Sequence, residues 1–314
     1  MTQLQLPAEF KRRTQEVHGE KGAAWLNTIP GLLEKYSVEW NVKLLRTHPN
    51  LSYNFVVEAS SKAYGRVFIK LSVPGLEVES EILALKHFDG NGCVRLLEHS
   101  IDDGIFLLEK VEPGSTLAEY THNGRDSEAV VICTEVIKRL HSSSTPEKRM
   151  LSVDSLEDRL PGFQSLKAQV RKGEAPFEIQ ILEHAEEEYA SLLSSTQKKV
   201  LLHGDLHHFN LLSSTQSGWL AIDPQGVIGD PAFEVAAFIR NPFPGIMKLN
   251  DVRTLMKCRI ESFSELLEMD RRRILGWSFA QTILASGWLF QDHGQGWEEW
   301  YQLGKLLLDL KEKR

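Results

Sequence analysis

The pattern of apolar residues changes near residue 112, and this change restricts the folds that the chain can adopt. Before it, β-branched and aromatic runs separated by turns predict five strands, with one amphipathic helix at 77–88 between the third and the fourth. The predicted strands are 38–45, 55–59, 67–71, 94–98 and 105–110. After Glu112 the apolar spacing becomes helical, interrupted by short apolar runs at 200–228. We therefore predict an α+β fold with two lobes: a small β-rich lobe over 1–111, including a helical N-terminal extension, and a larger helical lobe over 112–314. Ligands favour a cleft between two such lobes.

One of the predicted helices has a second interpretation. Residues 274–291 carry no charge and follow three arginines, a length and a flank that would also suit a membrane span. Polar residues and two glycines within the run favour a helix buried in the helical lobe instead, so we expect no membrane partner. The helices predicted for this lobe are 127–141, 178–193, 252–267, 274–290 and 297–310, and the first 35 residues show helical patterns broken near Pro30.

Composition excludes several classes of protein. Apolar residues make up 42% and charged residues 25% of the 314 residues, which excludes a disordered or low-complexity chain. A net charge of −7 argues against sequence-independent nucleic-acid binding, which needs a basic surface, and is compatible with a cationic small substrate. Three cysteines far apart in sequence, and an N-terminus without the apolar run of a signal peptide, indicate a cytoplasmic protein.

The segment His203–Asn210, with the sequence HGDLHHFN, and the later Asp223 carry the chemistry. Phosphoryl transfer from a nucleotide needs a carboxylate that orients the attacking hydroxyl and takes its proton, and oxygen ligands that hold Mg²⁺. Asp205 can supply the first, and Asn210 with Asp223 can supply the second. The spacing of five residues from Asp205 to Asn210 equals that of the protein-kinase catalytic loop, in which the Asp and the Asn have these roles.

Candidate nucleotide-binding residues lie in the smaller lobe. Lys70 ends a predicted strand and can reach phosphates, and Glu81 on the following helix is its candidate partner, with Glu79 as the competitor. The turn between the first two strands, with Ser52 and Asn54, takes the place of a phosphate-covering loop, but the chain has neither a GxGxxG nor a Walker motif. From their position alone, the backbone groups of Glu109 and Val111 could pair with an adenine edge.

Other residues admit structural interpretations that compete with functional ones. His203, His207 and His208 could suggest zinc, but His203 and His207 span a Gly-Asp turn and lack an HExxH helix, so we expect no zinc site. Four tryptophans near the C-terminus could form a platform for a sugar or a cation, but core packing is the commoner role of such residues. These are Trp277, Trp288, Trp297 and Trp300.

Four segments carry a resemblance to a known family. They are 203–212 (HGDLHHFNLL), 219–236 (WLAIDPQGVIGDPAFEVA), Arg240-Asn241-Pro242, and Ala24-Trp25-Leu26 with Pro30. Together they resemble the aminoglycoside phosphotransferase family, which has a protein-kinase-like fold, and within it the branch of streptomycin 6-phosphotransferases and hydroxyurea resistance kinases. The resemblance extends over nearly the whole chain.

The resemblance implies roles for individual residues. Asp205 would be the catalytic base, Asn210 and Asp223 would bind Mg²⁺, and Lys70 with Glu81 would grip the phosphates of ATP. His203 would brace the catalytic loop, and Asp230 and Glu234 would pack beneath it. Many relatives carry Asp where this chain has Glu234.

We therefore predict an ATP- and Mg²⁺-dependent transfer of the γ-phosphoryl group to a hydroxyl of a small molecule, first among them a cationic aminoglycoside such as streptomycin. A kinase of a cellular metabolite, such as a sugar or an amino alcohol, is one alternative. A nucleotide-binding pseudokinase with a regulatory role is another, against which the intact set of Asp205, Asn210 and Asp223 argues. A monomer and a homodimer both fit the sequence.

Overall fold

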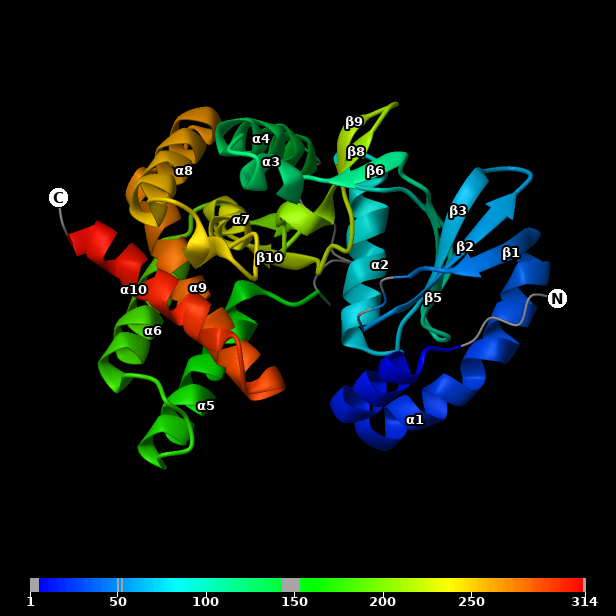
Figure 1. Ribbon diagram of the computed structural model, residues 1–314, viewed down its shortest axis with the longest axis horizontal. Helices are drawn as coiled ribbons and strands as arrows, with labels where there is room; N and C mark the ends of the chain where they lie inside the picture. Colours follow the sequence, from blue (N-terminus) through cyan, green and yellow to red (C-terminus); the bar gives the residue numbers. More distant parts are fainter. Residues whose placement is uncertain (1–5, 50, 52, 143–152, 313–314) are drawn as a thin grey trace. The chain divides into compact units, whose positions relative to one another are not determined.

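The structure is a computed structural model that describes residues 6–49, 51, 53–142 and 153–312. The chain divides into two compact units, Met1–Glu112 and Pro113–Arg314, and Figure 1 shows the elements of each.

The described part of the first unit is built on a five-stranded antiparallel sheet with the strand order β1-β2-β3-β5-β4. Two helices accompany it, and Figure 1 shows them on opposite faces of the sheet. The elements are α1 (Ala8–Glu39), β1 (Val42–Thr47), β2 (Phe55–Ser61), β3 (Gly65–Leu71), α2 (Leu76–Phe88), β4 (Leu96–Ser100) and β5 (Ile105–Glu109). The predicted order of three strands, a helix and two strands is confirmed.

The first helix differs from the sequence prediction in two ways. The predicted break near Pro30 is wrong: α1 continues through Pro30, because Ile29 and Leu33 on either side of it are buried in the core of the unit, and this packing outweighs the missing hydrogen bond. The interruption lies instead at Gly19, whose φ of 56° suits a glycine. The predicted strand at 38–45 began too early, since Val38 is the exposed end of α1 (78% accessible).

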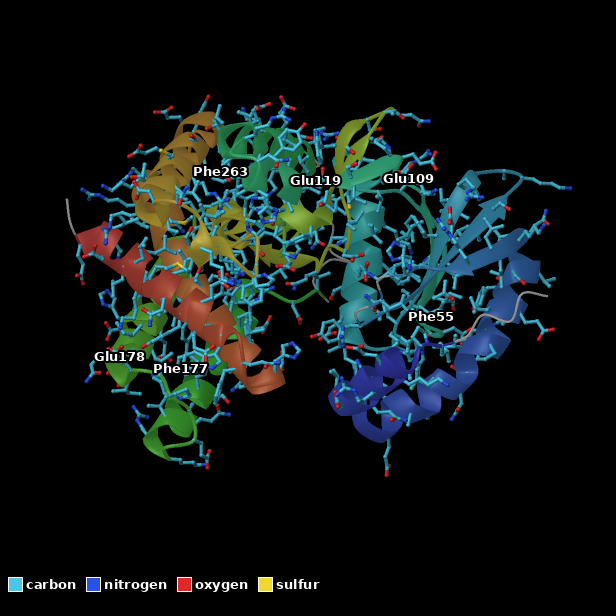
Figure 2. The ribbon with its side chains drawn as sticks, viewed as in Figure 1. Phe55, Glu109, Glu119, Phe177, Glu178 and Phe263 are labelled. Carbon is cyan, nitrogen blue, oxygen red and sulfur yellow. The ribbon has the colours of Figure 1, made fainter. Side chains whose placement is uncertain are left out.

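Side chains alternate along β3, so its apolar residues face the core with α1 and Lys70 faces the other side of the sheet. Val67, Ile69 and Leu71 belong to one apolar cluster with side chains of α1, and Phe55, labelled in Figure 2, packs its ring 5.6 Å from that of Phe10 in the same cluster. Because successive side chains of a strand point to opposite faces, Lys70 lies on the face turned away from α1. Lys70 pairs with Val56 of β2 and Phe106 of β5 in the sheet register.

In its described part, the second unit is mainly helical, as predicted, and its short strands form two small sheets. Its helices are α3 (Ala118–His122), α4 (Asp126–Ser142), α5 (Leu160–Arg171), α6 (Ile179–Ser194), α7 (Val235–Ile239), α8 (Val252–Leu267), α9 (Arg271–His293) and α10 (Trp297–Glu312). Its strands are β6 (Pro113–Thr116), β7 (Val200–Leu202), β8 (Leu211–Ser214), β9 (Gly218–Ala221) and β10 (Val227–Gly229), paired as β6-β8-β9 and β10-β7. The sequence did not predict α3, α5, α7 or β6.

The apolar helix α9 lies at the centre of this unit. All residues from Ile274 to Gly287 are buried, which confirms the buried helix predicted there, and Trp277 packs edge-on against Tyr189 of α6 and Phe233. Among the described residues, no helix has the length and apolar character needed to cross a membrane. Phe263 of α8, labelled in Figure 2, extends the core with its ring 5.3 Å from that of Phe238.

Candidate active site

Two short β-ribbons in the second unit present the predicted catalytic residues. Strand β7 pairs with β10, with Leu202 opposite Val227, and strand β8 pairs with β9, with Leu211 opposite Ala221. The chain therefore leaves β7 at residue 203, enters β8 after residue 210, and passes from β9 to β10 through residues 222–226. Asp205 and Asn210 lie in the first of these connections, and Asp223 lies in the second.

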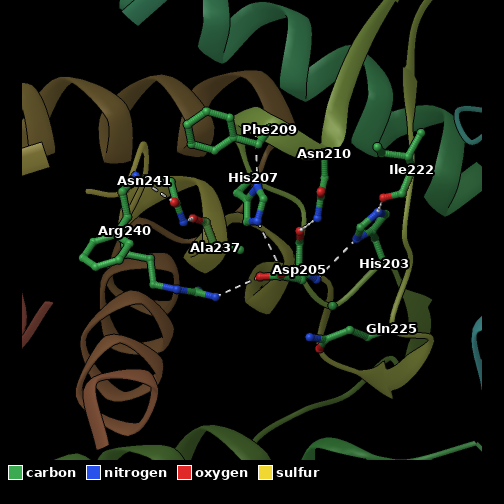
Figure 3. A network of polar contacts seen from close by, with 12 residues as sticks. His203, Asp205, His207, Phe209, Asn210, Ile222, Gln225, Ala237, Arg240 and Asn241 are labelled. Atoms are coloured by element: carbon green, nitrogen blue, oxygen red, sulfur yellow. Dashed lines mark hydrogen bonds and ion pairs between the residues drawn. The ribbon is translucent and has the colours of Figure 1, made fainter. Parts of the chain in front are cut away.

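Backbone hydrogen bonds hold the two connections together. The Ile222 N–H donates to the Asn210 carbonyl oxygen (3.0 Å), and the Gln225 N–H donates to the His203 carbonyl oxygen (2.8 Å). The Asn210 side-chain amide donates to the Asp205 carbonyl oxygen (3.0 Å), as Figure 3 shows. The structure thus brings Asp205, Asn210 and the segment with Asp223 together.

The Asp205 carboxylate is partly exposed, with 25% of its side chain accessible, and it lies beside two basic side chains. Arg240 donates through Nη2 to Oδ1 of Asp205 (3.0 Å), and Nε2 of His207 lies 3.4 Å from Oδ2. Burial by itself raises the pKa of Asp205, but His207, Arg240 and other basic groups outweigh it, so the pKa lies below its ordinary value. The carboxylate is therefore ionised at neutral pH, the form that accepts a proton.

Backbone donors assign the tautomers of two histidines in this loop. The Phe209 N–H donates to Nδ1 of His207 (3.2 Å), so the neutral ring carries its proton on Nε2, the nitrogen that faces Asp205. In the same way, the Asp205 N–H donates to Nδ1 of His203 (3.3 Å). Nε2 of His203 then donates to the Ile222 carbonyl oxygen (2.8 Å), so this fully buried ring joins the two connections.

The donor chemistry of Asn210 and Asp223 fits Mg²⁺. The Asn210 amide nitrogen donates to the Asp205 carbonyl oxygen, and the amide oxygen is a separate acceptor. Asp223 follows the hydrogen-bonded Ile222 and has a φ of 57°, a left-handed conformation that aspartate tolerates better than most residues. Mg²⁺ prefers oxygen ligands, and a kinase site typically supplies one or two carboxylates beside the phosphates.

Glu234 accepts hydrogen bonds from the start of the loop 203–210. Its Oε2 accepts from the His203 N–H (2.8 Å) and its Oε1 accepts from the Gly204 N–H (2.9 Å). His141 of α4 approaches Oε2 within 3.1 Å, and the side chain of Glu234 is fully buried. The longer glutamate side chain therefore reaches both N–H groups.

Asp230 contacts other elements. Its Oδ1 accepts from the Ala232 N–H (2.9 Å), where it caps the 3₁₀ turn Pro231–Glu234, and its Oδ2 pairs with Arg273 of α9 and accepts from the Thr196 hydroxyl (3.2 Å). Asp230 thus ties the end of β10 to α9, and its link to the loop runs through the pairing of β10 with β7.

In the first unit, Lys70 and Glu81 form a buried ion pair. Nζ of Lys70 donates to Oε1 of Glu81 (2.6 Å), and only 4% of the lysine side chain is accessible. Asn54 lies at the start of β2, where Oδ1 accepts from the hydroxyl of Ser72, just after β3 (2.6 Å). Ser52, the other predicted residue of this turn, lies outside the described residues.

Glu109 and Val111, the two residues predicted to meet an adenine, have different surroundings: Glu109 is hydrogen-bonded to Arg95, and Val111 is buried. The Glu109 N–H donates to the Arg95 carbonyl oxygen (3.1 Å), and its carboxylate accepts from the backbone and side chain of Arg95. The Glu109 N–H is therefore already used within the first unit and is not open to a base. The Val111 side chain is buried.

Sequence reasoning assigned no role to Arg240, which the structure places against Asp205. The residue follows α7 and was visible only as part of the Arg-Asn-Pro segment shared with the resembling family. Thirty-five residues separate it from Asp205, and no spacing rule connects the two.

The comparisons with known proteins identify the family. The sequence model of the aminoglycoside/hydroxyurea antibiotic resistance kinases matches residues 37–294, most of the chain. The chain belongs to this family. The streptomycin 6-kinase of Streptomyces griseus is 28% identical over 285 residues, which cover 87% of each chain.

Solved structures agree on the fold of this family member. The choline kinase LicA of Streptococcus pneumoniae superposes with a TM-score of 0.63 at 17% identity, covering 90% of this chain and 99% of LicA. The amicoumacin kinase hAmiN, solved with AMP-PNP and Ca²⁺, gives a TM-score of 0.61 at 15% identity, covering 90% of this chain and 93% of hAmiN. The predicted protein-kinase-like α+β fold is confirmed, and the chain is a small-molecule phosphotransferase.

Proposed function

We propose that this kinase transfers the γ-phosphoryl group of ATP, with Mg²⁺, to a hydroxyl of an aminoglycoside such as streptomycin. The observation that carries the proposal is the hydrogen bonding of the two connections: the Asn210 side-chain amide donates to the Asp205 backbone carbonyl oxygen, and the Ile222 N–H, next to Asp223, donates to the Asn210 carbonyl oxygen. This is the arrangement of groups that phosphoryl transfer needs on the acceptor side and the metal side.

Asp205 would orient the acceptor. Its carboxylate would accept a hydrogen bond from the hydroxyl and take its proton as the oxygen–phosphorus bond forms and the bond from the γ-phosphorus to the β-phosphate oxygen breaks, leaving ADP. His203 and Glu234 would keep the loop in place from below, since both bond its backbone. Asp230 would support the neighbouring strand.

Asn210 and Asp223 would hold Mg²⁺, which neutralises charge on the phosphates when bound. Lys70, fixed by Glu81, would grip phosphate oxygens, with Asn54 and Ser52 in the covering turn. The carbonyl of Glu109 and the backbone of Val111 would meet the base. Positioning and charge stabilisation would supply most of the rate acceleration.

The acceptor is proposed from the relatives. The streptomycin 6-kinase similar to this chain covers most of its length, which favours an aminoglycoside and, with it, a cationic substrate. A sugar or amino alcohol of the cell is the second candidate acceptor. We further propose a cytoplasmic enzyme, active as a monomer or homodimer, because the three cysteines show no disulfide spacing and ATP is abundant in the cytoplasm.

A coupled ADP-release assay with Mg·ATP and a panel of acceptors tests the proposal. The panel contains streptomycin, other aminoglycosides, hydroxyurea, choline and simple sugars, and Asp205→Asn is the inactive control. Stimulation by streptomycin, lost in Asp205→Asn, supports the proposal. Stimulation by a metabolite alone replaces the acceptor and keeps the mechanism, whereas stimulation that survives in Asp205→Asn contradicts the role of Asp205.

A further inference from the structure

Arg240 is a buried arginine whose guanidinium contacts the proposed catalytic base. Only 5% of the residue is accessible, and Nη2 donates to Oδ1 of Asp205 (3.0 Å), as Figure 3 shows. Nη1 donates to Oε1 of Gln281 in the middle of α9 (2.6 Å). The guanidinium also lies 5.1 Å from the centre of the Trp300 ring of α10.

The backbone around Arg240 is fixed as well. Nε1 of Trp300 donates to the Arg240 carbonyl oxygen (3.0 Å). The fully buried Arg259 donates through Nη1 to the carbonyls of Phe238 (3.1 Å), Ile239 (3.1 Å) and Asn241 (2.7 Å). Three contacts of the guanidinium and four hydrogen bonds to the surrounding backbone therefore restrict the movement of the Arg240 side chain.

Arg259 is in turn held by a carboxylate. Its Nη2 and Nε donate to the two oxygens of Asp126 at the start of α4, at 2.6 Å and 2.9 Å. Paired arginine–carboxylate bonds of this kind fix orientation as well as distance. The segment that carries Arg240 is therefore anchored to α4, α9 and α10.

The two oxygens of Asp205 are thereby made different. Oδ1 is held by Arg240 at 3.0 Å, whereas Oδ2 has the longer contact of 3.4 Å with His207. An aspartate carboxylate turns readily about its terminal bond, and a base that turns presents the wrong lone pair to its substrate. A fixed partner on one oxygen prevents that rotation and leaves the other oxygen to the substrate.

We infer that Arg240 is a positioning residue of the phosphoryl transfer: it fixes Oδ1 of Asp205 so that Oδ2 receives the proton of the acceptor hydroxyl, and Gln281 with Trp300 holds Arg240 in place. The inference rests on the proposed function, because it assigns the orientation of the base named there. Arg240 acts through Asp205 and touches neither phosphate nor acceptor in this role.

A double-mutant cycle tests the inference. Arg240→Met, Asp205→Asn and the double variant are assayed by ADP release with streptomycin, or with the panel compound that the enzyme phosphorylates. We expect Arg240→Met to lower kcat on the order of 10–10²-fold and to leave the KM for ATP within about twofold, because a misplaced base slows the chemical step. In the Asp205→Asn background the same change should alter kcat by less than about threefold, because the group on which Arg240 acts is gone.

Two further variants separate positioning from a structural role. Arg139→Met is the matched control, since Arg139 of α4 donates to the carbonyls of Ser217 and Trp219 and should leave kcat within about twofold. Arg240→Lys keeps the charge but cannot reach Asp205 and Gln281 together, so its kcat should fall between those of wild type and Arg240→Met. If Arg240→Met does not fold, the cycle is run with Arg240→Lys and judged in the same way.

The outcomes are distinct. An unchanged kcat in a folded Arg240 variant, or losses that multiply in the double variant, would overturn the inference while the proposed function stands. Turnover at the wild-type rate in Asp205→Asn alone would overturn the proposed function itself. A loss in Arg240→Met that vanishes in the Asp205→Asn background supports both.

Discussion

Glu234→Gln is expected to destabilise the second unit and to slow catalysis together. The carboxylate accepts from two buried backbone N–H groups, one on each oxygen, at 2.8 Å and 2.9 Å. Glutamine has nearly the same shape but offers one acceptor oxygen, and its amide nitrogen would face the second N–H group. That buried N–H loses its partner, which costs about 1–3 kcal/mol, and the remaining bond loses the assistance of a charge, which costs about 1 kcal/mol more.

The free energy of unfolding should therefore fall by about 2–4 kcal/mol. Urea unfolding followed by tryptophan fluorescence measures it, and ADP release at saturating substrates measures kcat. Because His203 and Gly204 lead into Asp205, their displacement should lower kcat by on the order of 10–10²-fold.

Two variants sharpen the experiment. Glu187→Gln makes the same chemical change on an exposed position of α6 and should stay within about 0.5 kcal/mol of wild type. Glu234→Asp keeps the charge but shortens the side chain by one methylene, so its losses should be smaller than those of Glu234→Gln. If Glu234→Gln matches wild type in both stability and kcat, these hydrogen bonds do not brace the loop and the reasoning is refuted.

Three further predictions concern other residues. Asp205→Asn should lower kcat by on the order of 10²–10⁴-fold while ATP binding by calorimetry persists, and wild-type turnover would contradict its role as base. Asp223→Ala should weaken ATP binding in the presence of Mg²⁺ but not in its absence, and equal losses in both titrations would argue against a metal ligand. Hydrogen bonds from Lys110 and Arg46 lower the pKa of the buried Glu58 to about 2, so its ionisation contributes about 3 kcal/mol of stability above pH 4.5, a contribution that is lost as the pH falls toward 2. In urea titrations, the difference in the free energy of unfolding between wild type and Glu58→Gln should be widest at neutral pH and should narrow between pH 4.5 and pH 2. A difference that does not depend on pH would contradict this contribution of Glu58.

Much of the fold could be predicted because local patterns and tertiary packing agree. Strand β3 and helices α2, α8 and α10 follow their apolar periodicity nearly to the residue. The prediction failed where packing overrides local preference. Proline favours a helix end, yet α1 passes through Pro30 because its neighbours are buried against the sheet.

For the candidate site, the sequence indicated the residues of the proposed chemistry but not those that contact and position them. Asp205, Asn210 and Asp223 stand at spacings that reflect one chemical task, so the sequence itself points to them. Arg240, Gln281 and Trp300 come from three separate elements, and only the folded chain brings them beside Asp205 or one another. Side chains that position others carry no motif, because any element at the right distance can supply them.

Because side chains alternate between the two faces of β3, the packing of α1 against one face also determines the face on which the Lys70 ammonium group lies. A slip of β3 by one residue would turn Lys70 toward α1 and expose Val67, Ile69 and Leu71, which are fully buried against it. Burying one such apolar side chain contributes about 1.5–3 kcal/mol, so the correct register is favoured by several kcal/mol before any phosphate is bound. Packing of the core against α1 therefore also fixes the direction of Lys70, and under the proposed function an error of strand pairing at β3 would abolish activity.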